Sequence, residues 1–328
     1  MIEVQDLVKR YGTHTALDHL SFTIDDGGIY GLLGPNGAGK STTMNILTGY
    51  LCANEGTVTV NGHDILKETE KAKAEIGYLP EMPPLYEDMT VREYLEFVCE
   101  LKKLKGEKIA DEVKRISGKT GIGDVLERLI RNLSKGYKQR VGIAQALVGS
   151  PAIIILDEPT VGLDPLQIIE IRDLIRELKS EHTVILSSHI LSEVSAVCDE
   201  ILIISNGRLV AKDSAENLSR LSEGKKLLHL VVKGDRKQIE AVLAEFPKIQ
   251  ECRMEEVSEG FKLELALGDG NDIREELFYG FANAHLPILE MSMEHASLEE
   301  VFIDLTKDEA DNTENKDNTE NEQEAAGS

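Results

Sequence analysis

Residues 34–41 have the types and spacing of a loop that holds phosphate groups. They fit the pattern Gly-x-x-x-x-Gly-Lys-Ser/Thr. In such a loop the glycines let backbone N–H groups curl around β- and γ-phosphates, Lys40 adds a cation, and the Ser41 hydroxyl binds Mg²⁺. The alternative is a glycine-rich turn, but that would not require the apolar strand before the loop or the helix after it. We therefore predict a nucleotide site with contacts from Asn36, Gly37, Ala38, Gly39, Lys40, Ser41 and Thr42.

Two adjacent carboxylates, Asp157 and Glu158, follow four aliphatic residues at 153–156. At the tip of a buried strand, Asp157 can hold the Mg²⁺ shell while Glu158 orients or deprotonates an attacking water. Adjacent carboxylates also occur at strand ends simply as a solvated stop. In a chain that carries a phosphate loop, the pair favours the catalytic interpretation.

Residues 133–137, Leu-Ser-Lys-Gly-Tyr, resemble the LSGGQ signature of the ATP-binding subunits of ABC transporters. The other motifs of that family follow in its order, namely the paired carboxylates, a D-loop at 162–165, and His189 within Ser-Ser-His. The resemblance covers residues 2–213. It implies an α/β fold with a P-loop NTPase ABC ATPase core and an inserted helical subdomain. It also implies ATP and Mg²⁺ as cofactors, and ATP hydrolysis coupled to transmembrane transport.

The resemblance further implies a site made by two chains. Ser134 and Gly136, at the start of a helix, would contact the γ-phosphate bound to the loop of another copy, so that two copies sandwich two ATP molecules. The alternative for Ser134 is an ordinary helix N-cap, and one serine can serve both roles. In the family, His189 contacts the γ-phosphate and senses its loss, and Tyr11 stacks on adenine. The alternative for Tyr11 is packing against the β-layer.

This chain departs from the family pattern at three positions. Lys135 and Tyr137 replace the usual Gly and Gln, so the ribose contact of that Gln is not carried over. Glu81 replaces the glutamine of the Q-loop, and its carboxylate can ligate Mg²⁺ or water but cannot donate an amide hydrogen bond. The predicted site therefore contains Lys40, Glu158 and His189 for catalysis, Ser41, Asp157 and Glu81 for the metal, and Tyr11, Glu81, Ser134 and Gly136 beside the loop for the nucleotide.

Strands and helices alternate around these motifs, as in a mainly parallel sheet covered on both faces. The spacing of apolar residues predicts strands near residues 2–4, 20–24, 29–33, 57–60, 152–156, 183–187 and 201–204, and helices at 40–48, 134–148, 165–178 and 190–198. A helical, charged pattern over 90–131 predicts an inserted α subdomain, which we place at about 82–148.

A second domain is expected after a linker at 222–226. The order β-α-β-β-α-β over 227–293 is that of a ferredoxin-like α+β domain, and a last helix is expected at 298–305. This part resembles the accessory domain of ATPases of the ABC-2 export type. We therefore predict an ATPase domain at 1–221, an accessory domain at 222–307, and an acidic, disordered tail at 308–328.

The composition limits the partners and the compartment. The 328 residues include 36 Lys and Arg against 59 Asp and Glu, and a net charge of −23 argues against a nucleic-acid partner. Four separated cysteines without CxxC spacing fit a reducing compartment. No apolar run is long enough to span a membrane. We expect a cytoplasmic protein that is peripheral on the cytoplasmic face of the cell membrane.

The expected function is ATP hydrolysis that energises a separately encoded ABC-2 type permease in an exporter, through ATP-driven dimerisation of two copies. Residues 82–86, Met-Pro-Pro-Leu-Tyr, form an apolar loop where the permease can dock. The alternative is a loop packed on its own subdomain. The competing functional class is a non-transport ABC ATPase of the chromosome-maintenance or translation-factor kind. A single phosphate loop, the absence of heptads and the acidic charge weigh against that class.

Overall fold

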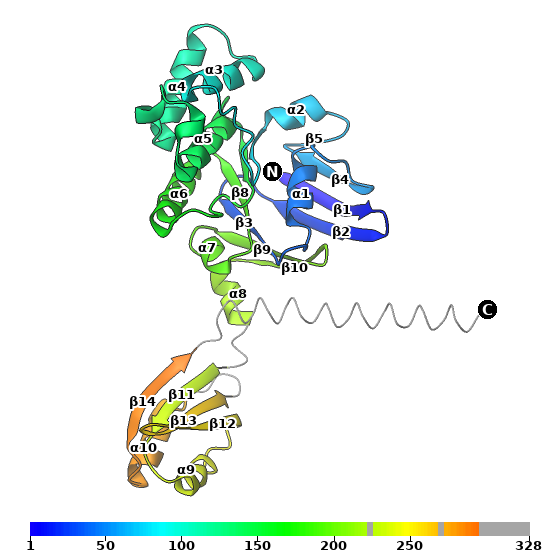
Figure 1. Cartoon of the computed structure of the whole chain (residues 1–328). Coiled ribbons are helices and arrows are strands. Elements are labelled where there is room, and N and C mark those ends of the chain that lie inside the picture. Colours follow the sequence, from blue (N-terminus) through cyan, green and yellow to red (C-terminus); the bar gives the residue numbers. More distant parts are fainter. Residues whose placement is uncertain (222–225, 268–271, 295–328) are drawn as a thin grey trace, which may run out of the picture. The chain divides into compact units, whose positions relative to one another are not determined.

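The structure is a computed structural model that describes residues 1–221, 226–267 and 272–294. Two compact units divide between Ala215 and Glu216 (Figure 1). The predicted division lies later, at the end of α8 (Ala215–Leu221). The helix predicted at 298–305 and the tail predicted at 308–328 lie outside the described residues.

The first unit begins with a four-stranded antiparallel sheet. Its burial alternates over much of β1 and β2, because one face of the sheet packs on the core. The strand order is β2-β1-β4-β5, with β1 (Ile2–Tyr11), β2 (His14–Ile24), β4 (Glu55–Val60) and β5 (His63–Asp64).

A six-stranded sheet in the same unit carries the motifs. Its order is β10-β9-β3-β8-β7-β6, and only β10 pairs in the antiparallel sense. All residues of the central strands β3, β7 and β8 are buried, which agrees with the continuous aliphatic runs of a sheet covered on both faces. The strands are β3 (Ile29–Leu33), β6 (Ile76–Leu79), β7 (Ile153–Leu156), β8 (Thr183–Ser188), β9 (Glu200–Ser205) and β10 (Arg208–Asp213).

The main core of this unit joins the two sheets to α1 (Lys40–Leu47). Leu7 and Leu20 come from the antiparallel sheet, Met44 from α1, and Ile155 from the parallel sheet. Aliphatic packing against both sheets therefore fixes the helix that follows the phosphate loop, and with it the position of the first turn of that helix.

Helices complete the first unit. Its helical subdomain contains α3 (Val91–Leu101), α4 (Glu107–Thr120), α5 (Lys135–Leu147) and two short 3-10 turns, η1 (Gly123–Val125) and η2 (Ile130–Asn132). Thr90 and Glu93 form a capping box that starts α3. A Cβ at Gly77 would lie 1.9 Å from the carbonyl oxygen of Ala146, so glycine lets α5 approach β6 closely. The remaining helices are α2 (Thr69–Ala74), α6 (Pro165–Leu178) and α7 (Leu191–Ser195).

The second unit confirms the ferredoxin-like order. Its four strands are all antiparallel, in the order β12-β13-β11-β14, and leucines on β11 and β13 form a core with Leu277 and Phe281 of α10. Its elements are β11 (Lys226–Val232), α9 (Arg236–Leu243), β12 (Ile249–Val257), β13 (Gly260–Leu267), α10 (Arg274–Asn283) and β14 (Ile288–Glu294).

The predicted fold class is confirmed, with differences in individual elements. The sequence patterns did not predict α2, β5, β6, β10 or α8, which are short or lack a clean apolar period. The helix expected at 190–198 is the shorter α7. In the described part of the chain, no helix has the length and apolar character needed to cross a membrane.

Candidate functional site

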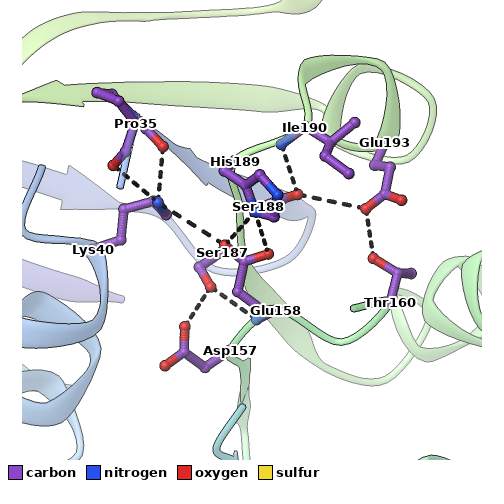
Figure 2. Close-up of polar contacts among 11 residues, drawn as sticks. Pro35, Lys40, Asp157, Glu158, Thr160, Ser187, Ser188, His189, Ile190 and Glu193 are labelled. Atoms are coloured by element: carbon purple, nitrogen blue, oxygen red, sulfur yellow. Dashed lines mark hydrogen bonds and ion pairs between the residues drawn. The ribbon is translucent and has the colours of Figure 1, made fainter. Parts of the chain in front are cut away.

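Parallel pairing brings the predicted motifs to one edge of the sheet. Leu33 of β3 pairs with Ser188 of β8, and Leu156 of β7 pairs with Leu186 of β8. Parallel strands all end at the same edge. The phosphate loop, the two carboxylates and the histidine segment, which each follow one of these strands, therefore meet there (Figure 2).

A cavity of about 390 Å³ lies at this edge. Most of the predicted site residues line it: Tyr11, Asn36, Gly37, Gly39, Lys40, Ser41, Thr42, Glu81, Glu158 and His189. His14, Ala16 and Val161 also line it and were not predicted. Tyr11 is 49% exposed, so its ring is available to a ligand rather than packed into the β-layer.

The loop backbone is shaped for an anion. Gly39 has φ of +107°, and a Cβ there would lie 2.7 Å from the carbonyl oxygen of Ala16, so this position requires glycine. The N-terminus of α1 has no side-chain cap and no acidic residue in its first turn. Its first N–H groups can therefore donate to phosphate oxygens. Ala38 is buried, and its N–H donates to the carbonyl of Pro35 at 3.1 Å.

Lys40 is 6% exposed and is held by the loop itself. Its ammonium donates to the carbonyls of Gly34 at 2.8 Å and Pro35 at 3.2 Å, and its Nζ lies 3.9 Å from Oε1 of Glu158. Burial lowers the pKa of Lys40, while the carboxylates of Glu158, Asp157 and Glu81 oppose that shift. The result is a buried cation beside carboxylates, in the place where the phosphates of a nucleotide would enter.

Ser187, near the end of β8, bonds the side chain of Asp157 and the backbone of Glu158. Its buried hydroxyl donates to Oδ1 of Asp157 at 2.5 Å and accepts from the backbone N–H of Glu158 at 2.9 Å. Burial raises the pKa of Asp157, and the hydrogen bond from Ser187 acts against that rise. No role of its own was predicted for Ser187. The signal that could have identified Ser187 is a hydroxyl residue at the buried end of an aliphatic strand.

Replacing Ser187 with alanine is expected to lower the free energy of unfolding by roughly 1.5–3 kcal/mol, the range for hydrogen bonds to charged groups. The loss falls on the ionised form of Asp157, whose pKa would rise further without its donor. The effect should therefore be largest above the pKa of Asp157 and shrink as the pH falls through it, down to the pH-independent cost of the Glu158 N–H that loses its acceptor. Denaturant unfolding at several pH values measures it. Ser180→Ala, on an exposed hydroxyl that donates to the Glu177 carbonyl, is the control. Equal losses in both variants would contradict this account.

Glu158 and His189 contact each other across the cavity. Nδ1 of His189 lies 3.0 Å from Oε2 and 3.1 Å from Oε1 of Glu158. Glu158 is 8% exposed and has φ of 48°, a left-handed conformation that costs a non-glycine residue on the order of 1–3 kcal/mol. The histidine side chain is 42% exposed. A buried carboxylate in a strained backbone position, facing a partly exposed imidazole, has the geometry of a base and its partner.

The donor set fits a magnesium ion that takes much of its coordination from phosphates and water. Within the described ranges, no group of three or more His, Cys, Asp or Glu side chains forms a metal cage. Ser41 and Glu81 line the cavity, and both act on the Asp157 carboxylate: Ser41 lowers the pKa of Asp157 and the charge of Glu81 raises it. Mg²⁺ is usually held by one or two carboxylates plus substrate phosphates.

The signature residues lie elsewhere in the same unit. Ser134 caps α5 by accepting from the N–H of Tyr137 at 3.3 Å, and Ser134 and Gly136 line a separate cavity of about 420 Å³. The hydroxyl of Tyr137 donates to Asp124 at 3.1 Å. A single chain therefore does not bring Ser134 and Gly136 to the cavity that contains Lys40.

A phosphate loop between a parallel strand and a helix, with two carboxylates at the tip of a nearby strand, defines a P-loop nucleoside triphosphatase. Residues 17–161 match the family described as ABC transporter. The chain is 30% identical over 307 residues to the linearmycin resistance ATP-binding protein LnrL of Bacillus subtilis (strain 168), covering 93% of this chain and 98% of that protein.

Two further comparisons agree with this match. The lantibiotic transport ATP-binding protein SrtF of Streptococcus pyogenes is 39% identical over 225 residues, 67% of this chain and 95% of that protein. A solved structure of an ATP-binding subunit of an ABC transporter superimposes with a TM-score of 0.61 at 32% identity, over 67% of this chain and 92% of that one. The chain therefore belongs to the ATP-binding proteins of ABC transporters, and it is an ATPase.

Proposed function

We propose that this protein energises an ABC-2 type exporter by binding and hydrolysing ATP on behalf of a separately encoded membrane permease. The match to the linearmycin resistance protein carries this proposal, because it covers 93% of the chain and so includes both units. A resistance ATP-binding protein with the same organisation favours movement of a compound out of the cell. The protein would act at the cytoplasmic face of the membrane, without nucleic acid.

In this mechanism the phosphates lie on the N-terminus of α1 and beside Lys40. Glu158, buried and held by Ser187, takes a proton from the attacking water, and His189 reports the presence of the γ-phosphate through its contact with Glu158. Ser41, Asp157 and Glu81 would hold Mg²⁺, which when bound neutralises charge developing on the phosphates. Tyr11 offers its ring to the adenine.

A second copy of the chain would complete each site. Ser134 and Gly136 start α5 in a cavity separate from Lys40, so they can reach a γ-phosphate only on another copy. Two chains arranged head to tail would place each α5 N-terminus against the other chain's nucleotide. ATP would then act as the bridge between copies, and hydrolysis would release them.

The permease is expected to dock beside the predicted loop 82–86. An apolar cavity of about 760 Å³ lies there, lined by residues that include Tyr78, Tyr86 and Phe97. Tyr86 packs against its own subdomain, 5.8 Å from the ring of Tyr94 and 5.5 Å from that of Phe97. Met82 is 84% exposed. The loop thus packs on its own subdomain and still leaves an apolar surface of the kind that binds a partner.

Alanine at both Leu85 and Tyr86 is expected to reduce permease capture and transport about tenfold, while ATP binding by the isolated protein stays unchanged. The reason is that Tyr86 lines the apolar cavity and Leu85 lies beside it in the loop, whereas neither residue lines the cavity that contains Lys40. Capture of the permease from detergent-solubilised membranes and export of its cargo measure the effect. Leu66→Ala, on an exposed leucine outside the apolar cavity, is the control. Unchanged capture and export in the double variant would exclude this docking surface.

A further inference from the structure

Glu193, on α7, lies where the loop after β7 meets the segment after β8 (Figure 2). Its Oε2 accepts a hydrogen bond from the Thr160 hydroxyl at 2.5 Å and lies 3.4 Å from the Ser188 hydroxyl. Thr160 is two residues after Glu158, and Ser188 directly precedes His189. One carboxylate oxygen therefore joins the two segments that carry the catalytic carboxylate and the histidine.

We propose that Glu193 is a positioning residue that keeps Glu158 and His189 in contact, so that it sets the rate of ATP turnover and leaves nucleotide affinity unaffected. Glu193 does not line the cavity that contains Lys40. It borders a separate, small cavity with Thr160 and Ser188. Its effect on the nucleotide site must therefore pass through those two hydroxyl residues. This inference rests on the hydrolytic roles proposed above.

The backbone conformation of Glu158 explains why the contact between Glu193 and Thr160 is needed. A left-handed non-glycine residue persists only where its surroundings fix it. On one side the Glu158 N–H is held by Ser187, and on the other side the chain is held at Thr160 by Glu193. Thr160 is 6% exposed, so without Glu193 its hydroxyl would lose its acceptor away from bulk water. The loop would then relax toward an ordinary conformation and withdraw Glu158 from His189.

The second segment is held in the same way. The Ser188 hydroxyl accepts from the N–H of Ile190 at 3.0 Å, at the turn that leads into α7, and it also reaches Glu193. His189 lies between these anchored positions, while its own side chain is partly exposed. Loss of the carboxylate would therefore loosen both partners of the 3.0 Å contact, and a displacement of about 1 Å can cost on the order of 10² in rate.

Arg172, on α6, gives a reason for a carboxylate rather than an amide at this position. It borders the same small cavity, and its Nε is buried without a hydrogen-bond partner in the part of the chain that the structure describes. A negative charge at Glu193 lies at the same cavity as this cation and opposes its charge. Glutamine would keep the acceptor for Thr160 but lose that opposing charge, so it should restore function only in part.

The test measures ATP hydrolysis and nucleotide affinity for the purified full chain with Glu193→Ala, Glu193→Gln, Thr160→Val and the combination of Glu193→Ala with Thr160→Val. We expect Glu193→Ala and Thr160→Val each to lower kcat by about 10- to 100-fold, with KM and the Kd for a fluorescent ATP analogue within about twofold. The combination should be no slower than Glu193→Ala alone, because Thr160→Val removes a contact that Glu193→Ala has already broken. Glu193→Gln should recover to within about threefold of the unchanged protein.

Glu177→Ala, on an exposed carboxylate of α6, is the matched control and should keep full activity. The proposal is overturned if Glu193→Ala keeps kcat within about twofold, if affinity falls as much as kcat, or if the losses of the two single changes add. Thr160→Val is nearly isosteric, so it tests the contact between Thr160 and Glu193 by itself if Glu193→Ala does not fold. Glu158→Gln distinguishes failure of the proposed hydrolytic roles from failure of the proposed role of Glu193. If Glu158→Gln keeps full ATP turnover, the hydrolytic roles are refuted. If Glu158→Gln is inactive and Glu193→Ala keeps full turnover, only the positioning role of Glu193 is refuted.

Discussion

Glu158→Gln is expected to lower ATP turnover by about 10² to 10⁴-fold while leaving ATP bound. The amide has the shape of the carboxylate and can still accept a hydrogen bond from His189, so the 3.0 Å contact can remain. What it loses is the ability to take a proton from water. Because ATP is then bound without being cleaved, the bridged pair of chains should accumulate. Steady-state phosphate release measures turnover, and size-exclusion chromatography with Mg²⁺ and ATP measures the pair.

Two comparisons make this result specific. Glu177→Gln introduces the same chemical change on an exposed position of α6 and should alter neither quantity. Glu158→Gln combined with Ser134→Ala should show less of the bridged pair, because Ser134 is proposed to contact the nucleotide of the other copy. Turnover by Glu158→Gln within about twofold of the unchanged protein would show that another group is the base.

Lys40→Ala is expected to weaken ATP binding by roughly 10- to 100-fold, since a hydrogen bond to a charged group is worth about 1.5–3 kcal/mol and each 1.4 kcal/mol is tenfold. Lys40 has a second role within the loop, where its ammonium donates to the carbonyls of Gly34 and Pro35 and faces Glu158. Its removal leaves the buried carboxylates without their cation. Titration with a fluorescent ATP analogue measures the affinity.

The control for this change is Lys67→Ala, because Lys67 is exposed and pairs with Asp64 on the surface. Its loss should leave the Kd unchanged. Thermal unfolding without nucleotide would show whether Lys40→Ala also disturbs the loop. A Kd within about twofold of the unchanged protein would contradict the assignment of Lys40 to the phosphates.

Patterns that depend on neighbouring residues predicted most of the fold. Four consecutive aliphatic residues before Asp157 identified β7, and the apolar spacing over 227–293 identified the order of the second unit. Elements such as β6 were missed because Gly77 interrupts a run of only four residues. That glycine is there because α5 packs closely on the strand, which is a tertiary constraint with no periodic signal.

The candidate site likewise combines features that local sequence patterns predicted with contacts that only the tertiary structure shows. By itself the sequence determined the phosphate loop, the carboxylate pair and the signature, because each is a local pattern whose backbone geometry follows from its own residues. Only the tertiary structure decided that Glu158 meets His189, 31 positions away, that Ser187 holds the Asp157 carboxylate and the Glu158 backbone, and that Glu193 joins the two segments. The reason is that these contacts depend on the order and register of β7 and β8 in the sheet, which side-chain spacing along one strand does not specify.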